Sequence, residues 1–158
     1  MVMFKRIVVR MDFNEPALAA LGYARAIAQS IGGSESVIHV IPAVASEVYA
    51  YSTEMVENWE RSAYQRLKEL MPAAERSTIE GRFEARVGAP VEEILNFAAE
   101  QKADLIVLGT HSRGAVGHLF LGSVAEPVVR RASCPVLTIG PAAARAAKPA
   151  ETDVAVSG

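Results

Sequence analysis

The residues best suited to chemistry in this 158-residue chain lie in one glycine-rich segment, Gly109–Ser123. Four glycines fall within its first fourteen residues. Glycine allows backbone N–H groups to turn toward a ligand and to approach it closely. His111, Arg113 and His118 add cationic groups or hydrogen-bond donors, and the segment contains no acidic residue. This combination is chemically suited to the phosphates of a small molecule.

A structural explanation of the same segment stays open. Loops between a strand and a helix are often rich in glycine for geometric reasons alone, and Ser123 is as well suited to an ordinary helix N-cap as to a ligand contact. The two roles are compatible, because the unpaired N–H groups of a helix start favour anions. A metal site is not favoured, since no carboxylate or cysteine accompanies His111 and His118 at ligand spacing.

Several familiar nucleotide-binding and catalytic motifs are absent. The chain has no G-x-x-x-x-G-K-[ST] phosphate loop, and no G-x-G-x-x-G follows its first apolar run. The segment 121–125 lacks the second glycine of a G-x-S-x-G nucleophile elbow. Because the glycine-rich segment contains no paired carboxylates and no evident pair of nucleophile and base, the sequence assigns no catalytic residue.

The elements that must position this segment alternate between strands and helices. Short β-branched runs without polar alternation are typical of strands buried on both faces of a parallel sheet. Such runs occur at residues 7–9, 37–41, 105–108 and 136–139. Residues 83–87 alternate between apolar and charged side chains, which predicts a strand at an edge of the sheet.

Helical apolar spacing separates these runs. It covers 17–31, ended by Gly32-Gly33; 56–70, stopped by Pro72; 91–99, preceded by Pro90; and a fourth helix that starts near Ser123. The order β-α-β-α-β-α-β-α-β predicts an α/β fold with an open five-stranded parallel sheet and helices on both faces. Residues 1–140 form one domain in this interpretation, and residues 141–158 form a disordered tail.

Composition narrows the class of protein. Lys and Arg number 16 against 18 Asp and Glu, and this net charge of −2 argues against a general nucleic-acid binder. No apolar run reaches the roughly 18–20 residues that span a bilayer, and the run at 7–9 is too short for a signal-peptide core. Cys134 is the sole cysteine, so nothing indicates an oxidising compartment. We expect a cytoplasmic protein whose anionic partner is a small phosphate ester.

In an open parallel sheet, ligands bind beyond the carboxyl ends of the strands, where the strand order reverses. Residues 11–14 follow the first predicted strand, and the glycine-rich segment follows the fourth. At this point the sequence resembles the universal stress protein family of the nucleotide-binding kind. The family motif G-x2-G-x9-G-[ST] maps onto Gly109, Ser112 and Gly122-Ser123. The likeness also covers 12–16, 39–41, 87–90, 104–108, 122–126 and 134–137.

The resemblance implies a Rossmann-like sheet of the adenine nucleotide alpha hydrolase kind, with an ATP pocket between the first and fourth strands. Met11, Asp12 and Val40 would frame the adenine, and Gly109 and Thr110 would lie under the ribose. The resemblance leaves open whether Mg²⁺ accompanies ATP. The phosphates would be held by His111, Ser112, Arg113, Gly114, Gly122, Ser123, Val124 and Ala125.

One position departs from the family motif. Ser112 stands where the motif has its second glycine. If that position needs a positive φ, a serine there costs about 1 kcal/mol of strain. If it does not, the serine hydroxyl could itself donate a hydrogen bond to a phosphate oxygen.

The resemblance also implies a homodimer, formed through the last strand, Val136–Ile139, and a regulatory role in the stress response. No turnover is expected beyond slow ATP hydrolysis or self-phosphorylation, and no nucleic acid or membrane partner is expected. A stress-linked dimeric interaction module that has lost nucleotide binding is the main alternative. An enzyme of the ATP-pyrophosphatase type is a weaker one, because no Ser-Gly-Gly loop follows the first strand.

Overall fold

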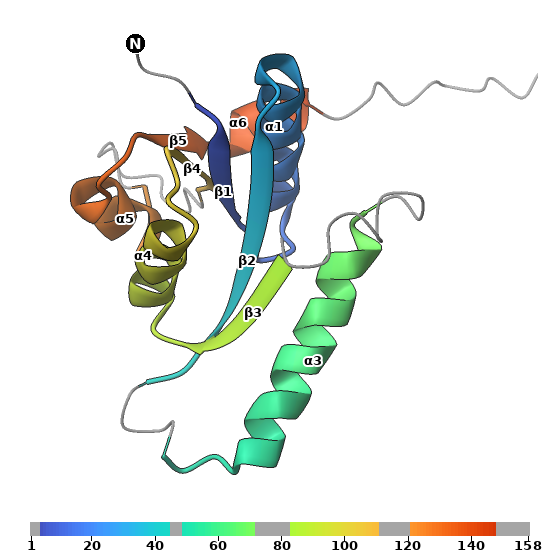
Figure 1. The fold of residues 1–158 in the computed structure, drawn as a ribbon, viewed down its shortest axis with the longest axis vertical. Coiled ribbons are helices and arrows are strands. Elements are labelled where there is room, and N and C mark those ends of the chain that lie inside the picture. Colours follow the sequence, from blue (N-terminus) through green and yellow to red (C-terminus); the bar gives the residue numbers. More distant parts are fainter. Residues whose placement is uncertain (1–3, 45–48, 72–82, 111–120, 148–158) are drawn as a thin grey trace, which may run out of the picture.

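The computed structural model describes residues 4–44, 49–71, 83–110 and 121–147. In these ranges five strands form one sheet in the order β3-β2-β1-β4-β5, and every pairing is parallel (Figure 1). The predicted α/β fold is therefore confirmed, and the strand that alternates in polarity lies at an edge as expected. The strands are β1 (Arg6–Arg10), β2 (Ser34–Pro42), β3 (Phe83–Gly88), β4 (Leu105–Gly109) and β5 (Val136–Ile139).

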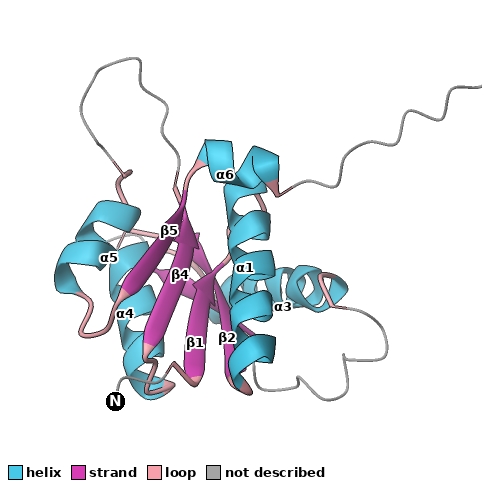
Figure 2. Cartoon of the chain, turned by 90° about the horizontal axis from the view of Figure 1, so that it is seen from above, coloured by secondary structure: helices cyan, strands magenta, loops and turns pink. Residues whose placement is uncertain are grey.

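Helices cover both faces of the sheet. Residues of α1 and α3 pack into the apolar cluster on one face, and residues of α4 and α5 pack into the cluster on the other. Figure 2 shows α1 and α4 on opposite sides of the strands, with α6 beside α1. The helices are α1 (Glu15–Ile31), α3 (Thr53–Glu69), α4 (Pro90–Glu100), α5 (Ala125–Arg131) and α6 (Pro141–Ala146).

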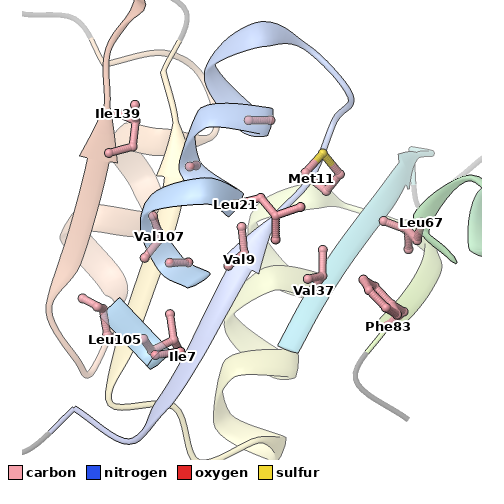
Figure 3. Close-up of a cluster of buried hydrophobic side chains, with 14 of the residues drawn as sticks. Ile7, Val9, Met11, Leu21, Val37, Leu67, Phe83, Leu105, Val107 and Ile139 are labelled. Atoms are coloured by element: carbon pink, nitrogen blue, oxygen red, sulfur yellow. The ribbon is translucent and has the colours of Figure 1, made fainter. Parts of the chain in front are cut away.

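The two apolar clusters form because successive strand residues point to opposite faces. In β1, Ile7 and Val9 belong to the cluster under α1, whereas Val8 belongs to the cluster under α4 and α5. Each of the three is at most 1% exposed, and full burial of such a side chain contributes about 1.5–3 kcal/mol. Figure 3 shows how Leu67 and Phe83 extend the first cluster toward α3. β1 is the central strand and thus contributes buried side chains to both hydrophobic cores.

The ends of α1 follow from its sequence. The Asn14 side chain accepts a hydrogen bond from the Ala17 N–H at 2.8 Å, which satisfies one of the orphan donors of the first turn. Pro16 lies in that turn, where a missing N–H costs nothing. Gly32 ends the helix with φ +62°, and its N–H donates to the Ala28 carbonyl. The predicted stop at Gly32-Gly33 is confirmed.

The fourth predicted helix begins at Ala125, close to the start near Ser123 that the sequence indicates. Its N-cap is Val124, which makes no side-chain capping bond, so of the two roles left open for Ser123 the N-cap role is wrong. The start at Ala125 places Pro127 in the first turn, where proline removes no intrahelical hydrogen bond. The position of Pro127 therefore limits where α5 can begin.

The last described residues also differ from expectation, since the sequence placed a tail from residue 141 onward. Residues 141–146 form α6, which packs against α1, and Ala144 is 2% exposed. Pro141 suits a first helical position, and the alanines that follow have the highest intrinsic helix propensity. The remainder of the predicted tail, from residue 148, lies outside the described residues.

The first turn of α1 lies directly against the backbone of β4. A Cβ atom added to Gly109 would lie 2.5 Å from the Pro16 carbonyl carbon and 2.7 Å from the Ala17 nitrogen. Both are backbone atoms, so the helix itself would have to move. Gly109 is thus a packing residue that sets the distance between α1 and the sheet, whatever its role toward a ligand.

We predict that Gly109→Ala lowers the free energy of unfolding by about 1–3 kcal/mol, because the added methyl group overpacks this contact. Gly22→Ala is the matched control. Gly22 lies in the middle of α1, has no atom within 4 Å of an added Cβ, and should gain about 0.5–1 kcal/mol. Urea denaturation measures both. A Gly109→Ala protein as stable as the wild type would contradict the packing role.

Candidate functional site

The candidate site lies where the strand order changes direction, at the carboxyl ends of β1 and β4. β1 pairs with β2 as far as Arg10↔Ile38 and with β4 as far as Val9↔Val107. Both neighbours continue beyond these pairs, β2 to Pro42 and β4 to Gly109. β1 therefore ends before its two neighbours. Just beyond its end, the Met11 N–H donates to the Ile38 carbonyl at 2.8 Å. Open α/β sheets bind ligands at this kind of position.

Two of the predicted adenine contacts have side chains in the hydrophobic cores. Met11 is fully buried in the cluster under α1, and Val40 is 7% exposed in the cluster on the other face. Their side chains are therefore packing groups. What Val40 can offer to a base is its main chain, whereas the Met11 N–H donates to the Ile38 carbonyl and the Met11 carbonyl lies 2.7 Å from His39 Nδ1.

Asp12 forms a turn at the end of β1. One carboxylate oxygen lies 3.0 Å from the Arg10 guanidinium, and the other accepts from the Asn14 N–H at 3.4 Å. Asp12, which the resemblance places beside the adenine, thus makes a turn contact in the fold. Its side chain is 19% exposed, so the carboxylate is partly accessible.

The next residue, Phe13, adopts φ +63°, which costs a bulky side chain about 1–2 kcal/mol. Its ring lies between two groups: the His39 imidazole, at 4.9 Å between ring centroids, and the Arg66 guanidinium carbon, 3.8 Å from the centroid. The sequence analysis assigned no role to Phe13 or Arg66. A left-handed backbone outside glycine has no local sequence signal, and Arg66 belongs to a helix distant in sequence.

His39 is the satisfied core histidine that an apolar strand predicts. Its Nδ1 lies 2.7 Å from the Met11 carbonyl oxygen. Because a carbonyl oxygen can only accept, Nδ1 carries the proton and donates it. Burial lowers the pKa of His39, and the nearby Arg66 charge lowers it further, while the bond to Met11 acts in the opposite direction. The imidazole is therefore held neutral in the fold.

The β4 side of the site is tied to β5. Thr110 is 6% exposed, and its N–H donates to the Ile139 carbonyl at 2.9 Å. Its hydroxyl lies 3.4 Å from the same oxygen. Thr110 thus has its polar groups directed at the neighbouring strand. The predicted contacts His111, Ser112, Arg113 and Gly114 lie outside the described residues.

The return into α5 carries the remaining predicted contacts. Gly122 has φ +116°, a backbone conformation that favours glycine. Ser123 is exposed, Val124 is the N-cap, and Ala125 is buried at 3% exposure. A surface hollow of about 370 Å³ adjoins this turn, lined by Gly122, Ser123, Glu126, Pro127, Arg130 and Arg131.

The two arginines of this hollow are paired with carboxylates. Arg130 lies 2.8 Å from Glu126 one turn away, and Arg131 donates to both carboxylate oxygens of Glu92, at 2.6 and 2.9 Å. The hydrogen bonds from Arg131 lower the pKa of Glu92 below its usual value. The two positive charges at the end of α5 are therefore held in ion pairs.

The part of the chain that the structure describes gives little support to a metal site or to a reactive cysteine. That part contains no group of three or more His, Cys, Asp and Glu residues that could hold a metal ion. Burial raises the pKa of the Cys134 thiol, as expected for an unreactive cysteine. Among the described helices, none has the length and apolar character required to cross a membrane.

A parallel sheet in this strand order, with its candidate site where β1 and β4 end, defines a Rossmann-like α/β protein. The chain belongs to the universal stress protein family, whose sequence profile matches residues 3–140. The resemblance drawn from the glycine-rich segment is confirmed at the level of the family.

Individual relatives agree with this assignment. A Thermus aquaticus protein, the "universal stress protein in QAH/OAS sulfhydrylase 3′region", is 35% identical over 144 residues, covering 87% of this chain and 99% of its own. The solved structure of MJ0577 superposes with a TM-score of 0.62 at 27% identity, covering 88% of this chain and 97% of that one. A universal stress protein solved in complex with cAMP has a TM-score of 0.53 at 28% identity, covering 86% and 96%.

The neutral state of His39 predicts a pH dependence of stability. Because burial lowers its pKa in the fold, the unfolded chain, with a pKa of about 6.5, binds more protons as the pH falls below neutrality. The free energy of unfolding should therefore decrease from pH 7.5 to 5.5. His39→Asn retains a donor without a titrating group and should flatten this dependence. Equal slopes for the two proteins in urea denaturation would contradict the assignment.

Proposed function

We propose that this chain is a regulatory protein of the stress response that binds an adenine nucleotide such as ATP. The observation that carries the proposal is the early end of β1, where the Met11–Asp12 turn follows while β2 and β4 both continue beyond their last pairs with β1. The related protein in complex with cAMP supports adenine as the base.

The base would be recognised through the main chain. The side chains of Met11 and Val40 are buried, and the Met11 N–H and carbonyl are bonded to Ile38 and His39. A purine at this position would therefore meet the Val40 main chain, the Asp12 N–H and the partly exposed carboxylate of Asp12. Peptide N–H and C=O groups suit adenine, whose Watson–Crick edge carries one donor and one acceptor. The ribose would then lie above Gly109 and Thr110.

The phosphates would lie on the other side of the site, toward α5. Gly122 allows a left-handed turn there, and the exposed Ser123 has a hydroxyl that can donate to a phosphate oxygen. His111 to Gly114 would complete this half. Mg²⁺, where it accompanies ATP, would be held through the phosphates, since Asp12 is already paired with Arg10.

We propose that the chain binds the nucleotide and does not turn it over at an appreciable rate. The Thr110 hydroxyl is directed at the Ile139 carbonyl, an acceptor that cannot take its proton as a base. Slow hydrolysis or self-phosphorylation is the most that we expect. Occupancy by the nucleotide would then change how the protein meets its partners under stress.

Calorimetric titration with ATP and Mg²⁺, on protein stripped of carried-over ligand, tests the proposal. Gly122→Val should abolish binding, because a β-branched residue is strongly strained at φ +116°. Ser112→Gly should keep or tighten it by restoring the family motif. Thermal melting of each variant separates lost binding from lost folding.

Two results would count against these assignments. No heat and no melting shift at millimolar nucleotide would overturn nucleotide binding and favour a dimeric interaction module instead. A tenfold weaker affinity for Ser112→Gly would mean that the serine hydroxyl donates to a phosphate.

We also propose that two copies associate through β5, which ends the strand order on one side. The Pro135 and Ile139 carbonyls accept from the N–H groups of Ile106 and Thr110 in β4. Because backbone groups alternate along a strand, those of Val136 and Thr138 are directed away from β4. They form the edge that a second copy would pair with.

Thr138→Pro tests this interface. It removes an N–H directed at the proposed partner while leaving the hydrogen bonds from β4 to Pro135 and Ile139 in place. We expect sedimentation velocity to show a monomer at concentrations where the wild type and Thr138→Val are dimers. A dimeric Thr138→Pro protein of the same affinity would exclude pairing through this edge.

A further inference from the structure

Three side chains from three different elements converge behind the turn that follows β1. His39 from β2 donates to the Met11 carbonyl at 2.7 Å, and its imidazole contacts the Phe13 ring at 4.9 Å between centroids. Arg66 from α3 lies over the same ring, 3.8 Å from its centroid. We call His39, Phe13 and Arg66 the rear clamp. Its members contact the turn from the side of α1 and α3, whereas Val40 belongs to the opposite face.

The bond from His39 determines how the peptide between Met11 and Asp12 is oriented. In a trans peptide the carbonyl and the N–H point in opposite directions. No cis peptide occurs in the described residues. When His39 holds the Met11 carbonyl, the direction of the Asp12 N–H is therefore determined as well. The placement of this peptide plane decides which hydrogen-bonding groups the turn can present.

Phe13 shows that the turn is held against its local preference. A bulky residue at φ +63° persists only where the surroundings stabilise it. Here the imidazole contacts the ring and the guanidinium covers it, in the arrangement of a cation–π contact. The strained residue directly follows the peptide that His39 orients, so both contacts stabilise one conformation of the turn.

We propose that His39 is a positioning residue for base recognition: through the Met11 carbonyl it presents the Met11–Asp12 peptide to adenine. The inference rests on the proposed function, since it assumes that the base lies at this turn. It assigns to a side chain outside the ligand contacts the role of discriminating adenine from another purine, because a rotated peptide would change the direction of the Asp12 N–H that faces the base.

Asparagine and leucine at residue 39 separate positioning from packing. The side-chain nitrogen of Asn is the same number of bonds from the backbone as Nδ1 of His, so His39→Asn can still donate to the Met11 carbonyl. His39→Leu fills a similar space but cannot donate. ATP and GTP share ribose and triphosphate, so the ratio of their dissociation constants reports on the base alone.

For His39→Leu we expect ATP affinity to fall about tenfold and GTP affinity to change less than about threefold. His39→Asn should retain the ATP/GTP ratio of the wild type within about threefold. A wild-type ratio in the Leu variant, or equal loss of both nucleotides, would overturn the inference. So would a wild-type protein that binds ATP and GTP alike, although nucleotide binding itself would stand. A wild type that binds neither would overturn the proposed function and, with it, this inference.

A measurement on the wild-type protein tests the inference even if the variants fail to fold. The ¹⁵N NMR shifts of the imidazole report which nitrogen carries the proton. At neutral pH we expect His39 as the Nδ1–H tautomer, and we expect its Nδ1 shift to move when ATP, but not GTP, is added. An Nε2–H tautomer would overturn the inference without any variant.

Discussion

The close contact between the first turn of α1 and the backbone of β4 is the constraint on which the other features depend. With a glycine at residue 109, the helix approaches the sheet until backbone meets backbone. This approach places the Asn14 cap, and with it the turn that leaves β1, beside the end of β4. The two halves of the candidate site are thus brought together by helix packing, before any ligand contributes.

Around that contact, the candidate site shares its residues with the hydrophobic core. Met11 and Val40 belong to the clusters on opposite faces of the sheet, and Thr110 is bound to β5. A base bound as we propose would therefore be recognised mainly through peptide groups whose positions the core determines. On the phosphate side, the arginines near α5 are held in ion pairs, so charge there is balanced by Glu92 and Glu126.

Periodicity in the sequence was sufficient to predict the five strands and the edge position of residues 83–88, and Gly32-Gly33 predicted where α1 ends. The exact start of α5 could not be predicted from Ser123, because Pro127 limits where a helix can begin. Helix α6 was missed because alanine carries little pattern, and its burial depends on contact with α1. The left-handed Phe13 and its contact with Arg66 are tertiary, and no spacing along the chain indicates them. The phosphate contacts from His111 to Gly114 stay predictions.

The central position of β1 limits which parts of the candidate site can change by substitution during evolution. Ile7, Val8 and Val9 are essentially inaccessible, and the strand is paired on both sides. Its amide hydrogens exchange with solvent only when the whole domain opens. The turn that follows it is anchored to the most protected part of the molecule, so the base side has little freedom to adapt to a new ligand. A shift in ligand range would more readily arise near the start and end of α5, where Ser123, Arg130 and Arg131 are exposed and lie outside the core.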